Sequence, residues 1–429
     1  MTTTDSRTLR RIEVVTIGDE LLLGFTIDTN AAHLARELAA VGVEIVQRST
    51  VGDDASTIAD VVGAALARTG AVITTGGLGP TSDDRTKPAI AAIFGREMRL
   101  DDEHLDWLER RWVQRFNSPL PAANRQQAMI PEGARKLTNN HGSAPGIWLE
   151  DDRGRWVAML PGVPREMRGM LADTLLPLVR ERVTGGTAVR SLTARTTGVA
   201  ESVLADRIDA LGTGPLAEGA ELAYLPSVDG VDLRITVRGK STADGDASLA
   251  VARQRLRDCL GVDIYGEGSI DLASIVLDLA RQRGYTIAVA ESCTGGLLGA
   301  RLTAIPGSSD VVLGGVIAYH NDVKRAQLGV PEAMLAEHGA VSEPVVRQMA
   351  SGIRERTGAT IGLSITGIAG PAGGTPEKPV GTVWIAADIA GNVTTRHFRS
   401  WGDREEIRYR AAQATLDLLR RYLLRDTRA

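Results

Sequence analysis

The stretch "VAESCTGG", Val289 to Gly296, places hydroxyl and thiol side chains between an apolar run and two glycines. The apolar run predicts a strand, and Gly295 and Gly296 predict a sharp turn into a helix. Ser292 would then lie near a helix N-terminus, where unpaired N–H groups can hold an oxyanion or a phosphate. The simpler interpretation is that Ser292 is only an N-cap, worth about 1 kcal/mol.

A tyrosine and a lysine end another apolar run, in "AYHNDVK", where Tyr319 precedes Lys324 by five residues. A serine hydroxyl is a poor nucleophile until a base removes its proton, and a desolvated lysine can be that base. Serine–lysine pairs are known variants of the catalytic triad, and a tyrosine hydroxyl can relay the proton. The alternatives are that Lys324 is a solvated helix residue and Tyr319 a core aromatic. Cys293 is a rival nucleophile because thiols are intrinsically reactive.

A glycine-rich segment, "SITGIAGPAGGTPEKPVGTVW", extends from Ser364 to Trp384 after another predicted strand. Glycines at such a position can bring backbone amides close to an anionic ligand. The alternative is a plain flexible loop. A long glycine-rich turn after a buried strand is more often functional, which favours a binding role.

A second glycine turn lies near the start of the chain, in "TTGGLGPTSDDRT". Gly76, Gly77 and Gly79 can approach a phosphate closely. The paired carboxylates of Asp83 and Asp84 suit Mg²⁺ that bridges phosphate oxygens. The simpler interpretation is that Asp83 is a helix N-cap and Asp84 part of the first helical turn.

The length of the chain, 429 residues, and the order of its predicted strands and helices indicate three domains. Residues 8–182 alternate strand and helix, which predicts an α/β doubly wound sheet that binds ligands at the carboxyl ends of its strands. After a glycine linker at Gly185–Gly186, residues 186–266 resemble a small KH-like or ferredoxin-like α+β unit. It lacks a GxxG loop, which favours a connecting or dimerising role. Residues 268–426 predict a second α/β domain, with a long final helix and strands at 285–290, 310–319, 361–370 and 381–389.

Composition limits the classes of function. Hydrophobic residues make up 43% and charged residues 24% of the chain, and its formal net charge is -4. This balance describes a globular protein without a general attraction for nucleic acid. No apolar run reaches about 18 residues and no secretory signal is visible, so we expect a cytoplasmic protein without a membrane span. Cys259 and Cys293 are then expected as thiols, and the six histidines lack the spacing of a zinc site.

The C-terminal motifs together resemble the C-terminal domain of the CinA family, the nicotinamide mononucleotide (NMN) deamidases. The resemblance rests on "AESCTGG", "YHNDVK", "HGAVSE" and "TGIAGPAGG...KPVGTVW", in this order. It implies hydrolysis of the carboxamide of NMN to nicotinate mononucleotide and ammonia, a step of pyridine nucleotide salvage that needs no cofactor. It also implies Ser292 as nucleophile, Lys324 as base and Tyr319 as an assisting hydroxyl. The substrate-binding residues would be Thr294, Gly295, Gly296 and Asn321, with the phosphate held by Arg404 and the loop glycines Gly367, Gly370, Gly373 and Gly374.

The N-terminal turn, with "GDELLLG" and "LPGVPREM", resembles the molybdopterin-binding MoaB/MogA-type domain in the form that CinA proteins carry. This resemblance implies a metal-dependent ADP-ribose pyrophosphatase, or else a molybdopterin-binding protein. For pyrophosphate cleavage, a divalent cation such as Mg²⁺ would lie on Asp84, Asp83 and Asp19, and Glu20 would serve as base. The loop "NNHGSAPG", Asn139 to Gly146, would close over the ligand.

Two further expectations follow from the family resemblance. One is a homodimer, which is also the commonest oligomer of soluble proteins. The other is the alternative suggested by the family's name, a competence or DNA-damage accessory that acts by binding partners rather than by catalysis. The net charge of -4 disfavours direct contact with DNA.

Overall fold

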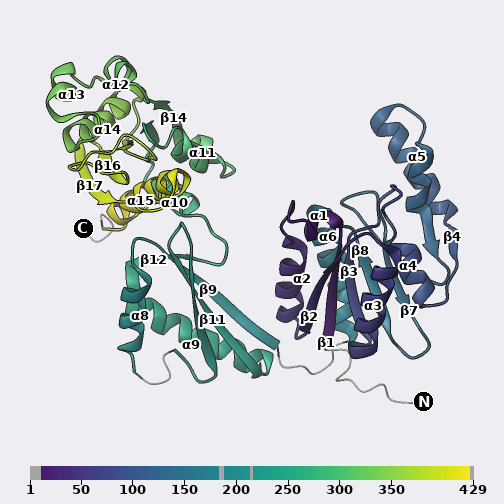
Figure 1. Ribbon diagram of the computed structural model, residues 1–429. Coiled ribbons are helices and arrows are strands. Elements are labelled where there is room, and N and C mark those ends of the chain that lie inside the picture. Colours follow the sequence, from purple (N-terminus) through teal and green to yellow (C-terminus); the bar gives the residue numbers. More distant parts are fainter. Residues whose placement is uncertain (1–10, 183–187, 213–215, 426–429) are drawn as a thin grey trace. The chain divides into compact units, whose positions relative to one another are not determined.

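The computed structural model describes residues 11–182, 188–212 and 216–425, which form three domains, each built on its own sheet (Figure 1). The chain divides into two compact units. The first contains the N-terminal domain, and the second contains the C-terminal domain with most of the middle domain. The predicted linker at Gly185–Gly186 lies outside the described residues.

The N-terminal sheet has six strands in the order β2-β1-β3-β8-β7-β6. Neighbouring strands are parallel from β2 to β8, whereas β7 and β6 add an antiparallel edge. A doubly wound sheet was therefore predicted correctly, apart from this edge. The strands are β1 (Arg11–Ile17), β2 (Glu44–Val51), β3 (Ala71–Thr75), β6 (Arg135–Leu137), β7 (Gly146–Glu150) and β8 (Trp156–Leu160), and a separate pair is formed by β4 (Met98–Leu100) and β5 (Met129–Pro131).

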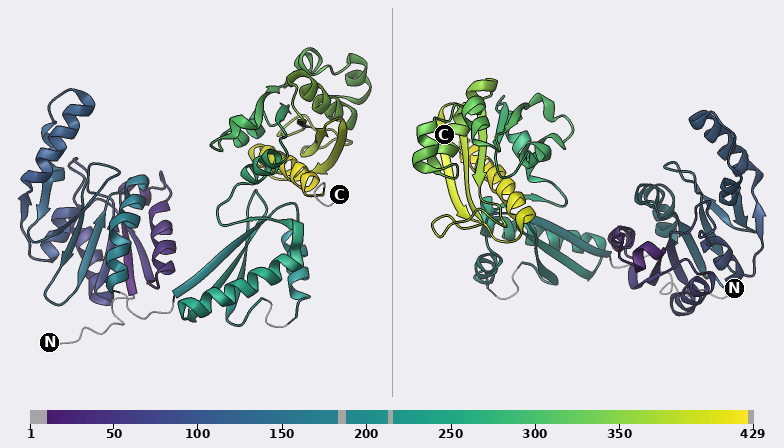
Figure 2. Two further views of the ribbon diagram at one scale, coloured as in Figure 1. Left: turned by 180° about the vertical axis from the view of Figure 1, so that it is seen from behind. Right: turned by 45° about the horizontal axis from the view of Figure 1, so that its top comes forward.

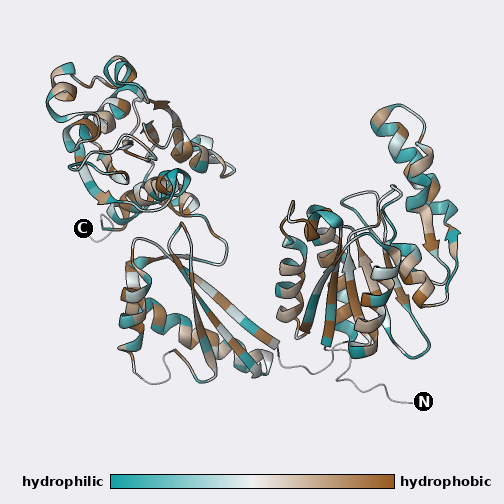
Figure 3. Ribbon diagram, in the orientation of Figure 1, coloured by the Kyte–Doolittle hydropathy of each residue, from teal (hydrophilic) through white to brown (hydrophobic). Residues whose placement is uncertain are grey.

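Helices cover both faces of this sheet, and two hydrophobic cores result. One core packs α2, α6 and α7 against the sheet, and the other packs α3 and α4 against the opposite face. In Figure 3 the strands between the helices are largely brown, as expected for strands buried on both sides. The helices are α1 (Asp19–Leu22), α2 (Thr29–Ala40), α3 (Ala55–Thr69), α4 (Thr86–Ile93), α5 (Asp102–Phe116), α6 (Pro164–Met170) and α7 (Leu176–Arg182).

The middle domain packs two helices on a four-stranded sheet of order β10-β11-β9-β12. Buried and more exposed residues alternate along β11, from Val231 through Leu233 and Ile235 to Val237. Because side chains alternate between the two faces of a strand, one face of β11 packs on the helices and the other face is more exposed. The elements are β9 (Ala188–Thr196), α8 (Glu201–Asp209), β10 (Ala220–Pro226), β11 (Val231–Lys240), α9 (Thr242–Leu260) and β12 (Ile264–Glu267).

The C-terminal sheet has five strands in the order β14-β13-β15-β16-β17. The first three are parallel, and β16 and β17 continue the sheet in antiparallel fashion. The strands are β13 (Ile287–Glu291), β14 (Val312–Ile317), β15 (Ile361–Gly367), β16 (Thr382–Ile389) and β17 (Asn392–Arg399). Strand β17 was not predicted from the sequence: it is an edge strand whose sequence NVTTRHFR is mostly polar and has no fully buried residue.

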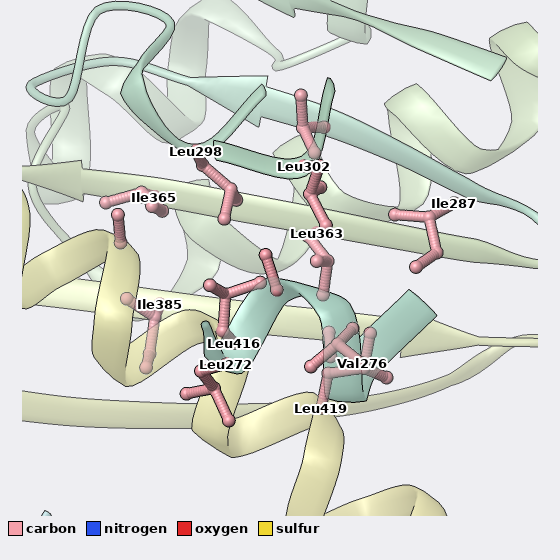
Figure 4. Packing of buried hydrophobic residues seen from close by; sticks show 14 of the residues in the cluster. Leu272, Val276, Ile287, Leu298, Leu302, Leu363, Ile365, Ile385, Leu416 and Leu419 are labelled. Atoms are coloured by element: carbon pink, nitrogen blue, oxygen red, sulfur yellow. The ribbon is translucent and has the colours of Figure 1, made fainter. Parts of the chain in front are cut away.

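Helices again cover both faces of the C-terminal sheet (Figure 2). Figure 4 shows one face, where leucines of α10, α11 and α15 meet Ile287, Leu363, Ile365 and Ile385 of the strands. The opposite face is packed by α12 and α14. The helices are α10 (Leu272–Gln282), α11 (Leu297–Thr303), α12 (Asn321–Leu328), α13 (Glu332–His338), α14 (Glu343–Thr357) and α15 (Arg404–Arg425). None of the helices in the described ranges is long and apolar enough to cross a membrane.

Candidate functional site

The carboxyl ends of three neighbouring parallel strands bring the predicted C-terminal residues together. Ser292 directly follows β13, and its N–H donates to the carbonyl of Ile365 in β15 at 3.0 Å. Lys324 lies in α12, the helix that follows β14. Its Nζ is 3.1 Å from the Ser292 Oγ. The two side chains that were predicted as nucleophile and base are therefore in hydrogen-bond contact.

The ammonium group of Lys324 is deeply buried, with only 1% of the residue exposed. Burial lowers the pKa of Lys324 below its ordinary value because the charged form loses hydration. Besides Ser292, the Nζ donates to the carbonyls of Ala318 at 2.8 Å and Tyr319 at 3.2 Å. A neutral amine has two protons and one lone pair, so it can donate to both carbonyls and accept the proton of the Ser292 hydroxyl. The interpretation of Lys324 as a solvated helix residue is wrong.

Cys293 packs in the hydrophobic core and also lines the cavity onto which Ser292 opens. Burial raises the pKa of Cys293 to about 12. A thiol with such a pKa carries almost no thiolate at neutral pH, and the thiolate is the reactive form. The hydrogen bond to Lys324 and the raised pKa of the thiol thus favour Ser292 over Cys293.

Contrary to the prediction, the N–H groups at the N-terminus of α11 are not unpaired. The buried carboxylate of Glu291 accepts hydrogen bonds from the N–H groups of Gly296 at 3.1 Å, Leu298 at 3.0 Å and Gly299 at 2.8 Å. The N–H of Gly295 donates to the carbonyl of Ser292. The helix end is therefore already neutralised by a protein carboxylate, and the predicted anion site over Gly295 and Gly296 is wrong. Ser292 is not the N-cap either, since that position is Gly296.

Tyr319 and Arg404 meet at the rim of the site. The Tyr319 ring is not a core aromatic, because 60% of the residue is exposed. Its hydroxyl accepts a hydrogen bond from Arg404 Nη2 at 2.8 Å, and Arg404 Nη1 donates to the carbonyl of Gly370 at 2.6 Å. Arg404 thereby links the tyrosine to the glycine-rich segment that follows β15.

These groups line a cavity of about 260 Å³. Its lining includes most of the predicted residues: Ser292, Tyr319, Asn321, Lys324, Gly367, Gly370, Gly373 and Arg404. Thr294, Gly295, Gly296 and Gly374 do not line it. Thr294 is fully buried, and its carbonyl accepts from Arg408. The segment after β15 is thus one wall of the cavity.

A second cavity, of about 590 Å³, lies at the carboxyl ends of β1 and β3 in the N-terminal domain. Gly76, Gly77 and Gly79 line it as predicted. A Cβ on Gly76 would lie 2.1 Å from the carbonyl oxygen of Ile17, so only glycine allows β3 to turn here. The lining also includes parts of the loop predicted to close over the ligand, Ser143 and Ala144.

Asp84 holds this glycine turn in place. Its carboxylate accepts from the N–H of Gly79 at 2.7 Å, and from the N–H and hydroxyl of Thr81 at 2.8 and 2.6 Å. The following helix, α4, begins at Thr86 with Arg85 as its N-cap. The interpretation of Asp83 as a helix N-cap is therefore wrong, and both aspartates border the cavity.

The acidic groups near this cavity differ in part from the predicted set. Asp19 is not among the lining residues, whereas Glu20, Asp53 and Glu166 are. Burial raises the pKa of Asp53, and the carboxylates of Asp19, Glu20 and Asp83 raise it further, against the lowering effect of the Asp19 N–H. Asp53 was missed, although its position after the second parallel strand could have indicated it. Within the described ranges, no three histidine, cysteine or acidic side chains are grouped so that they could hold a metal ion.

Comparison with known proteins assigns the family. A CinA-like protein of Gemmatimonas aurantiaca is 64% identical over 416 residues, which cover 97% of each chain. The chain belongs to the CinA family. A second CinA-like protein, from Salinibacter ruber, is 42% identical over 96% of this chain and 99% of its own.

The three domains match separate family models. They are described as "Probable molybdopterin binding domain" for residues 13–181, "Damage-inducible protein CinA KH domain" for 191–266 and "CinA C-terminal domain" for 269–423. The middle domain is therefore KH-like rather than ferredoxin-like. A solved structure titled competence/damage inducible protein CihA, from Agrobacterium tumefaciens, is 42% identical, covering 36% of this chain and 93% of its own with a TM-score of 0.34.

Proposed function

We propose that the C-terminal domain hydrolyses the carboxamide of NMN to nicotinate mononucleotide and ammonia. The observation that carries the proposal is the contact between the Lys324 Nζ and the Ser292 Oγ at 3.1 Å. The lowered pKa of Lys324 supports it, because a neutral amine is the form that can accept a proton. The choice of NMN as the substrate rests on the resemblance of the motifs to those of the family.

Two protons pass through Lys324 in turn, one in each half of the reaction. The Ser292 Oγ attacks the carboxamide carbon while its proton passes to the Lys324 Nζ. The tetrahedral intermediate then loses its C–N bond, and Lys324 returns the proton to the nitrogen, which leaves as ammonia. Water attacks the resulting ester and gives a proton to Lys324. The bond to Ser292 breaks, the serine regains the proton, and nicotinate mononucleotide is released.

The remaining groups of the cavity would bind the rest of the substrate. Arg404 offers a guanidinium beside the wall that contains Gly370, a combination suited to the phosphate. The Tyr319 hydroxyl, held by Arg404, would assist proton transfer or donate to the developing oxyanion. With the amides of Gly295 and Gly296 engaged, the backbone donor to the oxyanion would have to be the N–H of Cys293, which lines the cavity.

The test is release of ammonia from NMN by the full-length protein. We expect turnover by the wild type and by Cys293→Ala, and its loss in Ser292→Ala. Circular dichroism and thermal unfolding show whether each variant is folded. Activity that survives in Ser292→Ala and disappears in folded Cys293→Ala would reverse the assignment of the nucleophile. A wild type that releases no ammonia leaves the accessory role by partner binding as the better explanation.

For the N-terminal domain we propose hydrolysis of ADP-ribose with a divalent cation, Mg²⁺ by preference. The specific observation is a set of carboxylates near the large cavity: burial raises the pKa of Asp53, and the negative charges of Asp19, Glu20 and Asp83 raise it further. A cation would relieve this repulsion. Mg²⁺ is commonly held by one or two carboxylates together with substrate phosphates, so Asp83 and Asp53 would suffice on the protein side. The cation would supply charge neutralisation at the phosphates when bound.

Formation of AMP from ADP-ribose, with and without Mg²⁺, tests this second proposal. We expect AMP only with the cation, and at least a tenfold loss of activity in Asp53→Asn or Asp83→Asn. Molybdopterin binding without ADP-ribose turnover would favour the alternative function. Homodimerisation and a cytoplasmic location stay predictions, and size-exclusion chromatography with light scattering tests the first.

A further inference from the structure

A cavity of about 440 Å³ lies where the middle domain meets the C-terminal domain within the second compact unit. Two turns of the middle domain line one side, residues 197–201 and 226–231. The other side is formed by the end of β17 and by α15. None of the residues discussed so far as catalytic or substrate-binding lines this cavity.

Two deeply buried polar side chains of its lining have atoms without a hydrogen-bond partner. Ser400 is 6% exposed and Gln413 is 4% exposed, and the Ser400 Oγ and Gln413 Oε1 are unpartnered. The orientation of the Gln413 amide is fixed, because its Nε2 donates to the carbonyl of Asp229 at 3.1 Å and to the Thr197 Oγ1 at 3.2 Å. The oxygen is therefore left as an acceptor. Unpartnered buried polar atoms are unfavourable, so both indicate a ligand that brings hydrogen-bond donors.

The exposed indole ring of Trp401 provides a flat apolar surface in the same cavity. Trp401 lines the cavity and is 71% exposed, an unusual state for the largest side chain. The guanidinium of Arg410 covers one face of its indole, with 3.4 Å between the Arg410 Cζ and the ring centroid. The exposed indole offers a stacking platform for another planar ring, and Arg410 holds it in position.

Positive charge is available next to this platform. Arg396 lines the cavity and is exposed, and within the described residues it forms no ion pair. Its side chain lies on the face of β17 that Phe398 and α15 share, whereas Arg399, three residues further along the strand, lies on the opposite face. Of the cavity's carboxylates, Asp229 and Asp417 are paired with arginines, and Glu201 is exposed at the rim. Arg396 is therefore free to bind an anionic group of a ligand.

We propose that this cavity binds a free mononucleotide. The base would stack on Trp401 and donate its N–H groups to the Gln413 Oε1 and the Ser400 Oγ, and the phosphate would contact Arg396. A nucleotide is the common ligand class that combines a planar ring, N–H donors on its edge and an anion. A cavity of about 440 Å³ suits one nucleotide rather than a strand, and the chain's net charge of -4 also disfavours a polynucleotide.

Titration calorimetry of the full-length protein with AMP tests the proposal. Trp401→Ala should weaken one AMP-binding step by about tenfold or more, as expected for the loss of a base-stacking ring. Ser400→Ala removes a hydroxyl that bonds to nothing in the protein, so it should weaken the same step without lowering the unfolding temperature. Arg396→Gln should reduce the affinity for AMP toward that for adenosine. Leu313→Ala, which removes an exposed side chain of the same domain outside the cavity, is the matched control.

Three results would overturn the proposal. The first is no binding of AMP to the wild type, which would leave the cavity to water. The second is AMP binding that is unchanged in both Trp401→Ala and Ser400→Ala, which would place the ligand in another cavity. The third is tighter binding of a short single-stranded RNA than of AMP, together with weaker RNA binding by Trp401→Ala. This result would mean that the surface binds a nucleic-acid strand. Since the readout is binding rather than turnover, failure of NMN hydrolysis would not affect it.

Discussion

Lys87 and Lys324 are the two lysines that the described part of the chain buries, one in each α/β domain. Each lies in a helix that follows a parallel strand, and burial lowers the pKa of both. Each Nζ donates to two consecutive carbonyls, those of Gln126 and Gln127 for Lys87. Only Lys324 has a serine hydroxyl as its third partner and borders a cavity. Burial therefore creates a proton acceptor, but the hydroxyl and the access to substrate turn it into a base for catalysis.

Replacing each lysine by alanine separates these two roles, and here we expect the largest effect. Lys324→Ala should lower the kcat for ammonia release by about 10²–10⁴, the usual contribution of a general base. Lys87→Ala should leave this rate within about twofold, because Lys87 lies in a separate domain with its own cavity. The measurement is ammonia release per folded protein. Equal losses in the two variants would refute the assignment of roles.

The pH dependence of ammonia release tests the base directly. Lys324 accepts a proton only when neutral, so kcat/KM should rise with pH, about tenfold per unit, until pH exceeds the pKa of Lys324. Since burial lowers this pKa, the plateau should begin below the ordinary lysine value of about 10.4. Measurements between pH 6 and 10 in constant ionic strength would show it. A rate that falls as pH rises across this range would mean that the ammonium, not the amine, is the active form.

The pair Ser292 and Lys324 could be predicted because both follow apolar strands, and the ends of parallel strands meet at one edge. The role of Glu291 could not. A glutamate at the end of an apolar strand gives no local signal that its carboxylate will accept three N–H groups of the next helix. Strand β17 was missed because its polar residues lack a two-residue hydrophobic pattern. Trp401 gave no signal either, since its neighbours in the cavity come from segments far apart in the sequence.

Glu291→Gln tests whether the first turn after Ser292 depends on that carboxylate. Glutamine replaces one acceptor oxygen by a donor that faces backbone N–H groups, so we expect a loss of about 1–3 kcal/mol. The readout is hydrogen–deuterium exchange of the amides of Leu297–Thr303, which should accelerate about 5- to 150-fold. Glu343→Gln is the control, because this partly exposed carboxylate at the start of α14 accepts from the side chains of Arg347 and Thr395 rather than from backbone N–H groups of α11, and its ion pair should contribute less than about 1 kcal/mol. Equal exchange in both variants would contradict the special role of Glu291.

The last comparison concerns Lys87, as a purely structural counterpart of Lys324. Burial lowers the pKa of Lys87 to about 8, against the opposing effect of Asp84, whereas the unfolded chain has the ordinary value of about 10.4. Between these values the unfolded state binds more protons, so the stability of the N-terminal domain should rise as pH increases from about 8 to 10.4. Hydrogen exchange of the β3 amides, compared at each pH with Lys87→Met so that intrinsic exchange rates cancel, measures this gain. A difference between the two proteins that does not change with pH would show that Lys87 keeps its charge in the fold, and that its two carbonyl partners alone compensate for burial.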